Sequence, residues 1–584
     1  MKKEIELEVK RHSFAHILAS AVLEMFPEAK FGVGPNIENG FYYDFDLPRT
    51  LIPEDLPILQ KKMIKIINKN FAFEKSVVTH EKAIELFQKA RQEYKIEILN
   101  DEAKDSEVSL YRTGEFVDLC KGPHIDSTGE LDATSFKLTK IAGAYWRGDE
   151  KNKMLQRIYG VAFNNKKELK EYQHKLEEAA KRDHRKLGKE LDLFCFSDLV
   201  GPGLPLFSPK GVIIIEELKK HIENVCKGYG FQKVMTPHLA KIDLYEKSGH
   251  AQKFSKELFH VSSDQKHDFV MKPVQCPHQT QIYASKKRSY RDLPIRYMES
   301  EKQYRAEKSG EVGGLNRVYA ITVEDGHSFC RVEQVKQEVK NMVEIIKNFY
   351  SAIGLWGNHW VSLSVRDYAH PEKYIGDEKD WDKCEKMLEE VAKEMKLDAK
   401  KIEGEAALYG PKLDFMFKDS LGKEVQIPTV QLDFATPKRF DLVCTNEEGK
   451  DEFVVMVHRA ILGSYERFLA LMIEHFAGNF PLWLSPVQVK ILPVSSEKHL
   501  AYAQKIEKLL LENNIRVEID DNNESINKKI REAEKQKIPY MLVVGEKESQ
   551  SDSVAVRSKG SRDIKNMAID KFIKKIIKEI EEKK

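Results

Sequence analysis

Three widely separated segments of the chain carry side chains that could bind a metal ion. Cys276 lies in MKPVQCP, His327 in VEDGH and His458 in VHRAILG. Thiolate sulfur and imidazole nitrogen are ligands that Zn²⁺ prefers. A single buried cysteine or histidine is nevertheless more often a packing residue than a ligand, and the spacing of these three does not distinguish the two roles. The residue types therefore permit a metal site without establishing one.

A second group of similar side chains begins near the start of the chain. His12 and His16 are four residues apart, a spacing that puts both on one face of a helix. The later segment DLCKGPH, residues 118–124, adds Cys120 and His124. These four side chains could form a zinc site or a metal-free catalytic pocket, and their chemistry alone favours neither.

Composition indicates a multidomain globular protein. With 584 residues, 41% of them hydrophobic, the chain exceeds what one core usually fills, which predicts about two to four domains. The net charge of +2 gives no general attraction to polyanions, so a nucleic-acid surface must be a local patch. Seven dispersed cysteines without a CxxC pair argue against a disulfide framework. Because a signal-peptide core after Met1 and a long apolar run are both lacking, we expect a soluble, cytoplasmic protein without a membrane segment.

The elements that must position these side chains can be read from periodicity. A helical spacing of apolar residues from Phe14 to Phe26, followed by the strand-like run Phe41–Phe45, predicts a compact α+β unit. The stretch Lys166–Leu191 is rich in Lys, Glu, Arg and Leu and predicts one long solvated helix between domains. We expect a domain boundary near residue 183.

The rest of the chain predicts a sheet domain followed by a smaller domain. A helix is expected over Val212–Gly230 and another over Arg459–Phe476. Beyond Pro486, strands and helices alternate, which predicts a small α/β domain with mainly parallel pairing. The lysine-rich end, Lys571–Lys584, predicts an amphipathic helix. Strand-like runs that suggest one antiparallel sheet lie at 268–272, 296–304, 317–322, 413–417 and 425–434.

Three short segments resemble the motifs of class II aminoacyl-tRNA synthetases. Pro237 fits the motif 1 proline, YRAE at 304–307 followed by the strand at Arg317 is similar to motif 2, and GSYERF at 463–468 is similar to motif 3. With these in order, the chain from near residue 10 to its end resembles the threonyl-tRNA synthetases. The resemblance implies a multidomain α+β fold with an α+β editing domain and linker helix over 1–182, an antiparallel-sheet class II synthetase catalytic core over 183–484, and a C-terminal α/β anticodon-binding domain over 485–584.

The resemblance also implies an activity. The protein would be a ligase that activates threonine with ATP and transfers it to the 3′ end of tRNA(Thr). Cys276, His327 and His458 match the ligands of one zinc ion per chain, and three protein ligands leave a position open for the amino group and hydroxyl of threonine. Valine lacks that hydroxyl and is rejected there. Serine differs from threonine by one methyl group, worth only about 1–3 kcal/mol, so a second, hydrolytic sieve is needed.

That sieve is expected in the first domain. The segment DLCKGPH is similar to the editing motif of the family, and the match YKIE at 94–97 adds a lysine. By resemblance the pocket holds no metal and hydrolyses seryl-tRNA(Thr), whereas the same ligand types leave a second zinc ion as the competing interpretation. The residues expected to line it are His12, His16, Lys95, Asp118, Cys120 and His124.

The remaining expectations concern the sites for ATP, threonine and the anticodon. Fixed guanidinium groups can stabilise the negative charge that gathers when a carboxylate attacks a phosphate. By resemblance Arg305 contacts the amino-acid carboxylate and the α-phosphate, and Arg467 contacts the γ-phosphate and the adenine face. Asp325, Tyr409 and Gln431 are expected around threonine. The ATP site with its Mg²⁺ is expected to use Glu307, Arg317, Lys412, Gln426 and Thr429. The anticodon readers would be Asn523, Lys537, Glu548 and Arg557.

Some features depart from the family. A ubiquitin-like domain usually precedes the editing domain, whereas here the editing helix begins close to Met1. CPHQ, beginning at Cys276, replaces the more usual CPGH, and Val323 replaces a common glutamine. Because the zinc ligands are retained, we expect an intact zinc site. Motif 1 implies a homodimer. The rival interpretations are a non-catalytic tRNA-binding regulator and a hydrolase that acts through the first domain alone, and both predict broken ligase motifs, which the sequence does not have.

Overall fold

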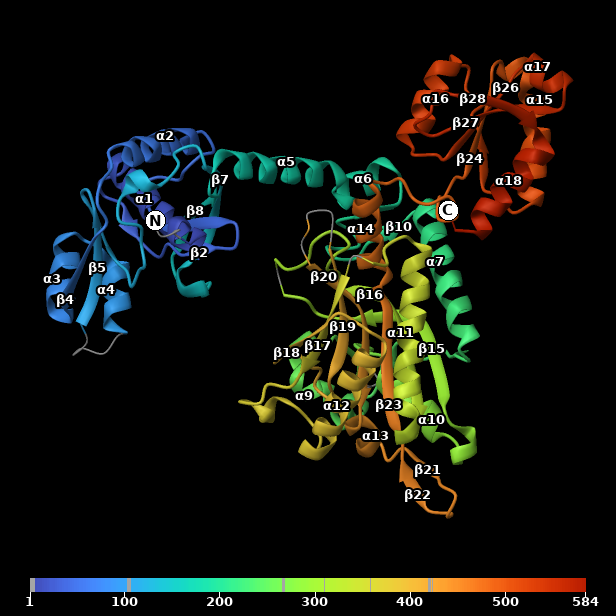
Figure 1. The fold of residues 1–584 in the computed structure, drawn as a ribbon, viewed down its shortest axis with the longest axis horizontal. Coiled ribbons are helices and arrows are strands. Elements are labelled where there is room, and N and C mark those ends of the chain that lie inside the picture. Colours follow the sequence, from blue (N-terminus) through green and yellow to red (C-terminus); the bar gives the residue numbers. More distant parts are fainter. Residues whose placement is uncertain are drawn as a thin grey trace. The chain divides into compact units, whose positions relative to one another are not determined.

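The computed structural model describes residues 6–101, 107–264, 268–308, 310–357, 359–418, 422 and 424–583. Residues 1–5, on which the argument against a signal peptide drew, and Lys584 lie outside the described residues. The chain divides into two compact units, Met1–Glu177 and Glu178–Lys584 (Figure 1). Among the described residues, no helix is both long and apolar enough to span a membrane.

A buried helix organises the first unit. In α1 (Leu7–Met25), residues such as Phe14, Ile17 and Leu18 are fully buried, because the helix packs on α2 (Asp55–Asn68) and on the central strand β3. The helix predicted from Phe14 is confirmed and begins earlier, at Leu7. The sheet has the order β1-β3-β8-β7, with β2 paired to β3. Its strands are β1 (Lys30–Phe31), β2 (Asn36–Ile37), β3 (Gly40–Asp46), β7 (Phe136–Tyr145) and β8 (Met154–Ala162).

A second, smaller sheet lies in the same unit. It has the order β4-β5-β6, and all pairs are antiparallel. A separate apolar cluster around Phe87 and Leu99 holds two short helices to it. The elements are β4 (Glu74–Thr79), α3 (His80–Lys89), α4 (Glu93–Asn100), β5 (Glu107–Thr113) and β6 (Phe116–Leu119).

The predicted single helix over Lys166–Leu191 is wrong in one respect. The structure has two helices there, α5 (Lys166–Arg182) and α6 (His184–Glu190). Asp183 between them has ψ 121°, and its side chain accepts a hydrogen bond from the backbone N–H of Arg185. An aspartate in extended conformation is a favoured helix N-cap, so a new helix begins instead of the old one continuing.

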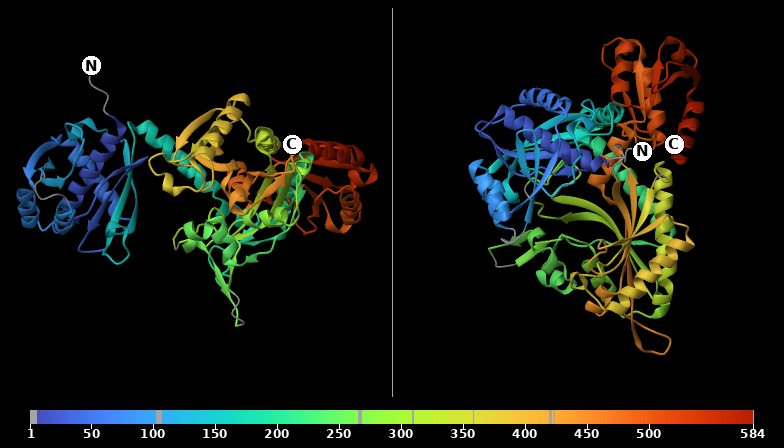
Figure 2. Two further views of the ribbon diagram at one scale, coloured as in Figure 1. Left: turned by 90° about the horizontal axis from the view of Figure 1, so that it is seen from below. Right: turned by 60° about the vertical axis from the view of Figure 1, so that its left-hand side comes forward.

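An eight-stranded sheet forms the centre of the second unit. Its pairs are antiparallel except for β11 with β15 at one edge and β17 with β18 at the other. The helix α11 (Val335–Ala352) packs against β16, β23 and β20, and Figure 2 shows it along one face of the fanned strands. In order, the strands are β11 (Gln232–Lys233), β15 (Ile295–Tyr304), β16 (Ala320–Cys330), β23 (Val455–Ser464), β20 (Glu424–Asp433), β19 (Lys412–Lys418), β17 (His359–Val365) and β18 (Ala399–Glu403).

Helices cover the apolar face of this sheet. The main core joins them to inward-facing side chains such as Val430, Leu432 and Val457. The helices are α7 (Pro209–Gly228), α11 (Val335–Ala352), α12 (Glu378–Glu394) and α14 (Tyr465–Phe476). The helix predicted from Arg459 is corrected: residues up to Ser464 belong to β23, and α14 begins at Tyr465 with Ser464 as its cap, accepting from the N–H of Arg467. Burial of Ile461 in the core favours the strand.

The predicted strand at 268–272 does not join the main sheet. It is β14, in a three-stranded sheet of order β12-β14-β13. Of the remaining elements, the strands are β9 (Phe194–Cys195), β10 (Leu206–Phe207), β12 (Leu239–Ala240), β13 (His260–Ser262), β14 (Asp268–Met271), β21 (Val443–Thr445) and β22 (Asp451–Phe453). The helices are α8 (Ile242–Ser248), α9 (His250–Lys253), α10 (Cys276–Ala284) and α13 (Ala435–Arg439). Single 3-10 turns occur at Thr128–Glu130, Trp146–Gly148, Ser255–Glu257, Tyr290–Asp292, Val332–Gln334 and Pro371–Lys373.

The C-terminal part of the second unit is a three-layer α/β domain. Figure 1 shows α16 on one face of its sheet and α15 and α18 on the other. The expectation of mainly parallel pairing is half right, because β24 pairs in parallel with β25 and β26, whereas β27 and β28 add antiparallel pairs. The elements are β24 (Val489–Pro493), α15 (Ser496–Glu512), β25 (Val517–Ile519), α16 (Ile526–Lys535), β26 (Tyr540–Val544), α17 (Glu546–Gln550), β27 (Ser553–Ser558), β28 (Ile564–Ala568) and α18 (Ile569–Glu581).

Candidate functional site

Strand register gathers the expected site residues on one face of the eight-stranded sheet. His327 on β16 pairs with His458 on β23, His458 with Gln431 on β20, and Gln431 with Lys412 on β19. Directly paired residues share a face, and successive residues alternate between faces. Val430, Leu432 and Val457 therefore point into the core while their neighbours form a polar row on the opposite face. Asp325 and Thr429 lie two residues from this row, on the same face.

Cys276 completes a compact ligand group with the two histidines. It is the first residue of α10, and helix N-termini favour the thiolate form of cysteine. One ligand atom from each of Cys276, His327 and His458 lies within 4.8 Å of the others, and all three residues are buried. The two imidazole rings are nearly perpendicular, with centroids 4.6 Å apart. Three soft or borderline donors in this arrangement could hold one metal ion and leave a further position open.

The second nitrogen of each imidazole is already bonded. His327 Nδ1 lies 2.7 Å from Gln279 Oε1, and His458 Nε2 lies 3.0 Å from Asp433 Oδ2. Metal-bound histidines usually donate their other N–H to a carboxylate or carbonyl oxygen in this way. His327 Nε2 is buried and has no hydrogen-bond partner among the residues that the structure describes. The Asp325 carboxylate lies 3.9 Å from this nitrogen, beyond hydrogen-bond distance. A buried imidazole nitrogen without a hydrogen bond, in one group with a cysteine, fits a metal ligand.

Burial sets the ionisation of this group. It lowers the pKa of His327 well below its ordinary value, so that the ring is neutral and its free nitrogen can bind a cation. It raises the pKa of the Cys276 thiol well above its ordinary value and that of Asp325 to about 6. A bound cation would oppose both increases, because it favours the charged forms of thiol and carboxyl groups.

Two cavities meet at Arg305. The first, here called the Tyr409 cavity, has a volume of about 580 Å³ and is lined by Tyr409, Gln431, Lys412 and His250. The second, the Arg467 cavity, has a volume of about 680 Å³. Arg305 lines both. The Tyr409 ring stacks on His458 with centroids 4.7 Å apart, which puts the Tyr409 cavity beside the metal-ligand group.

Most of the residues expected to bind ATP line the Arg467 cavity. They are Glu307, Arg317, Gln426 and Arg467. Arg317 pairs with Glu307 at 2.6 Å and with Glu311 at 2.7 Å. Gln426 Nε2 donates to Asp414 Oδ1 at 2.7 Å, and Lys412 Nζ lies 2.7 Å from Asp414 Oδ2. Thr429 is buried and is not among the residues lining either cavity, and Lys412 lines the Tyr409 cavity instead.

The first unit contains a separate cluster of polar side chains, here called the His124 pocket after the editing pocket expected there. It gathers all six residues expected there: His12 and His16 from α1, Lys95 from α4, Asp118 from β6, and Cys120 and His124 just beyond it. Cys120 Sγ lies 3.4 Å from His12 Nε2 and 3.3 Å from His124 Nε2. Lys95 forms a buried ion pair with Asp118. One ligand atom from each of the three histidines and Cys120 lies within 4.8 Å of the others, so a metal ion could also be held here.

Two hydroxyl groups order the polar side chains in this pocket. Tyr43 is fully buried, and its hydroxyl donates to Asp118 Oδ2 at 2.6 Å while accepting from Lys95 Nζ at 3.1 Å. Ser13 Oγ donates to the Val9 carbonyl and therefore accepts from His124 Nδ1 at 3.0 Å. That bond leaves His124 Nε2 as an acceptor for the Cys120 thiol.

Burial keeps the His124 pocket uncharged apart from its ion pair. It lowers the pKa of His12, His16 and His124, and it raises the pKa of Cys120 to about 11. Neutral imidazoles can accept a proton from a water molecule, and a protonated thiol is a weak nucleophile. The pocket can therefore position and activate water better than it can attack an ester directly.

Family models match both units. The tRNA synthetase class II core domain (G, H, P, S and T) matches residues 259–476, the anticodon binding domain matches 488–579, and the threonyl and alanyl tRNA synthetase second additional domain matches 108–159. A threonine–tRNA ligase from Halalkalibacterium halodurans is 46% identical over 98% of this chain and 89% of its own length. The chain belongs to the threonine–tRNA ligase family. Another relative in that family, from Geobacillus kaustophilus, is 45% identical over 99% of this chain and 88% of its own.

A solved structure agrees with this family. The RNA binding domain of threonyl-tRNA synthetase from Cryptosporidium parvum Iowa II has a TM-score of 0.65 and 34% identity, and covers 68% of this chain and 98% of that one. The class II fold expected from motifs 2 and 3 is therefore confirmed, together with the anticodon-binding and editing domains of the threonine–tRNA ligase family.

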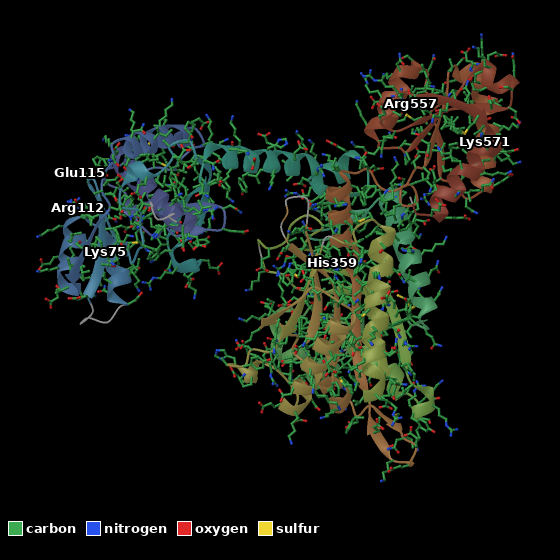
Figure 3. The ribbon with its side chains drawn as sticks, viewed as in Figure 1. Lys75, Arg112, Glu115, His359, Arg557 and Lys571 are labelled. Carbon is green, nitrogen blue, oxygen red and sulfur yellow. The ribbon has the colours of Figure 1, made fainter. Side chains whose placement is uncertain are left out.

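The four expected anticodon readers do not share one cavity. Asn523 lines a cavity of about 450 Å³ with Lys490 and Lys528, whereas Lys537 lines a small one beside Leu191. Glu548 caps α17 by accepting from the Gly545 N–H at 2.9 Å. Arg557, labelled in Figure 3, donates to Glu534 at 2.7 Å. Both charged side chains therefore have intramolecular partners in this structure.

Sequence reasoning missed several residues of the site. Asp433 lies two residues after Gln431 on β20, so alternation along the strand could have found it. His250 lines the Tyr409 cavity, and nothing in its local sequence indicates that. Tyr43 bonds to Asp118 and Lys95, and Gln279 bonds to His327 and Glu299. These partners lie in other segments of the chain, and no spacing rule signals such bonds.

Proposed function

We propose that this chain activates threonine with ATP, transfers it to the 3′ end of tRNA(Thr), and removes serine from mischarged tRNA in a separate pocket. The observation that carries the proposal is the position of Arg305 in the wall of both cavities, because adenylation requires one cation to face an amino-acid carboxylate and an α-phosphate together. Membership of the threonine–tRNA ligase family supplies the substrates.

The metal group supports zinc as the resident ion, one per chain. Cys276, His327 and His458 would hold it, and His327 Nε2 is a buried nitrogen that lacks a hydrogen-bond partner among the described residues. When bound, zinc would supply open coordination positions for an amino group and a hydroxyl; threonine offers both, whereas valine lacks the hydroxyl. Protein side chains next to the metal group would make the other contacts to threonine.

Three side chains next to the metal group are proposed to hold threonine. Asp325 lies on the same sheet face and would accept a hydrogen bond from the substrate hydroxyl. Tyr409 donates to Gln431 Oε1 at 2.6 Å, so the two residues form one fixed wall of the Tyr409 cavity. A rigid polar wall of this kind disfavours a substrate that leaves its groups unpaired.

Arg305 and Arg467 are proposed as the catalytic arginines. Arg305 would neutralise the reacting carboxylate and α-phosphate, and Arg467 the γ-phosphate, with its planar face against adenine. Glu307, Arg317 and Gln426 share their cavity and would complete the ATP site with Mg²⁺. Lys412 and Thr429 are proposed to approach the nucleotide from the neighbouring strands β19 and β20.

The His124 pocket is proposed as the editing site. Its six expected residues would bind the seryl ester and a water molecule, with Lys95 held by Asp118 and Tyr43. We propose that it works without a metal ion, although its four ligand atoms could hold one. Metal analysis decides between the two: one zinc per chain supports metal-free editing, and two would overturn it.

The remaining proposals concern organisation. We propose an editing domain with linker helix over 1–182, a catalytic domain over 183–484, and an anticodon-binding domain over 485–584 that uses Asn523, Lys537, Glu548 and Arg557. A cytoplasmic homodimer is proposed. Fully exposed Leu199 and 80% exposed Met235, the latter two residues before the motif 1 proline, offer apolar surface for a second copy.

Threonine-dependent pyrophosphate exchange tests the ligase function. We expect exchange with threonine, little with serine and none with valine, together with hydrolysis of seryl-tRNA(Thr). Tight tRNA binding without any exchange would support the regulator instead, and hydrolysis without exchange would support the hydrolase.

A further inference from the structure

Gln279 occupies a place where its family usually has histidine, and it makes the closest side-chain contact to the zinc-ligand histidine of β16. It lies on α10, three residues after Cys276, and is fully buried. Its Oε1 lies 2.7 Å from His327 Nδ1, and its Nε2 lies 3.4 Å from Glu299 Oε2. The amide therefore connects a metal ligand to a buried carboxylate.

The direction of each hydrogen bond in this chain of contacts is fixed. Lys272 Nζ donates to Thr236 Oγ1 at 3.1 Å, so the Thr236 hydroxyl proton points to Glu299, 2.9 Å away. The Thr236 backbone N–H also donates to Glu299 at 2.6 Å. Glu299 thus accepts from its neighbours and must meet the NH₂ side of the Gln279 amide, because a carboxylate cannot donate.

The orientation of the amide selects the histidine tautomer. With its NH₂ toward Glu299, Gln279 presents an oxygen to His327, and an oxygen can only accept. His327 must then carry its proton on Nδ1, which leaves a lone pair on Nε2. That is the nitrogen without a hydrogen-bond partner among the described residues, which leaves it available to a metal ion held with Cys276 and His458.

We infer that Gln279 is a positioning residue that sets His327 in the metal-binding tautomer, with Lys272, Thr236 and Glu299 fixing the amide. The inference rests on the proposed zinc site. Glutamine at this position then makes the same two hydrogen bonds as the histidine that is usual in the family, since a neutral imidazole could also donate to Glu299 and accept from His327.

The test compares three variants of the full-length protein. Gln279→Met keeps the size of the side chain and removes both hydrogen bonds. Gln279→His restores one donor and one acceptor. Thr280→Val is the matched control, because Thr280 is the next residue of α10 and is equally buried. Its hydroxyl donates to the Pro277 carbonyl at 2.6 Å and accepts from Gln281 Nε2 at 3.0 Å, so its bonds involve neither His327 nor Glu299. Zinc affinity by chelator competition and the visible spectrum of the Co²⁺-substituted proteins are measured, with circular dichroism as the check on folding.

We expect Gln279→Met to weaken zinc binding by roughly 10- to 100-fold and to shift the Co²⁺ bands, as loss of a partner behind a metal-bound histidine does. Thr280→Val should leave both unchanged, and Gln279→His should recover most of the affinity. Equal affinity and an identical spectrum in wild type and Gln279→Met would overturn the inference while leaving the zinc site standing. A wild-type protein that binds no zinc would overturn the proposed site itself. If Gln279→Met does not fold, Gln279→Asn, whose amide falls short of His327, replaces it in the same comparison.

Discussion

Replacing Tyr43 by phenylalanine should separate editing from aminoacylation. The substitution removes only the Tyr43 hydroxyl group. Its buried oxygen lies 2.6 Å from Asp118 Oδ2 and 3.1 Å from Lys95 Nζ. Burial raises the Tyr43 pKa well above its ordinary value, so the hydroxyl keeps its proton and donates to the carboxylate. Its removal leaves the ion pair of Lys95 and Asp118 without the hydroxyl that bonds to both side chains and fixes their positions.

The magnitude follows from the charge of the partners. A hydrogen bond to a charged group contributes about 1.5–3 kcal/mol. If the editing transition state depends on the position of Lys95, losing that contribution slows hydrolysis by roughly 10- to 100-fold, since each 1.36 kcal/mol corresponds to about a tenfold change in rate. The ligase site, which lies in the other unit, should not respond.

The assay is single-turnover hydrolysis of seryl-tRNA(Thr), with threonine-dependent pyrophosphate exchange measured on the same preparations. Tyr42→Phe is the matched control, because Tyr42 is the adjacent residue on β3 and points to the opposite face of the strand. We expect slow hydrolysis and normal exchange for Tyr43→Phe, and wild-type behaviour for Tyr42→Phe. Wild-type hydrolysis by Tyr43→Phe, or an equal loss of hydrolysis and exchange, would contradict this role of the Tyr43 hydroxyl.

Three further changes test other parts of the account. Asp433→Asn puts an NH₂ group where the wild type has Asp433 Oδ2, 3.0 Å from His458 Nε2, and should weaken zinc binding roughly 10- to 100-fold in a chelator competition. Unchanged zinc affinity would mean that Asp433 does not orient His458. Arg305→Lys removes a planar donor from the junction of the two cavities and should lower pyrophosphate exchange by roughly 100-fold, while seryl-tRNA hydrolysis stays normal. A loss of both activities would indicate a general folding defect. Burial lowers the pKa of His221 to about 4, so below pH 6.5 the unfolded chain binds a proton that the folded chain does not, and stability falls as the pH drops from 6.5 toward 4. The melting temperature of His221→Phe, which keeps the stacking on Phe349, should fall less over that pH range than the melting temperature of the wild type.

Local sequence was enough to predict the helices and strands that depend on periodicity. The strand at Phe41–Phe45 and the helix after Phe14 are confirmed because their side chains face one continuous core. The helix predicted from Arg459 fails over its first residues, since Ala460, Ile461 and Leu462 are apolar in a run that suits a buried strand as well as a helix. The central sheet decides in favour of the strand, and no local window contains that information.

In the site, too, local sequence predicted some features and the assembled fold decided others. The motifs identified Cys276, His327 and His458 individually, but only the pairing of β16 with β23 puts the two histidines side by side. Asp433, Gln279 and Tyr43 were missed because each acts through side-chain bonds to other segments. Their partners His458, His327 and Asp118 lie 25 to 75 residues away in the chain. Bonds of this kind depend on the assembled fold.

The most direct test of the account is the metal content of the purified protein together with the response of its metal site to threonine. We predict one zinc ion per chain and, after substitution with Co²⁺, a spectrum that changes when threonine is added and stays constant with valine. Cys276→Ala should lose both the ion and threonine-dependent exchange. A protein without zinc, or one whose metal spectrum ignores threonine, would contradict the claim that a three-residue metal site selects the substrate.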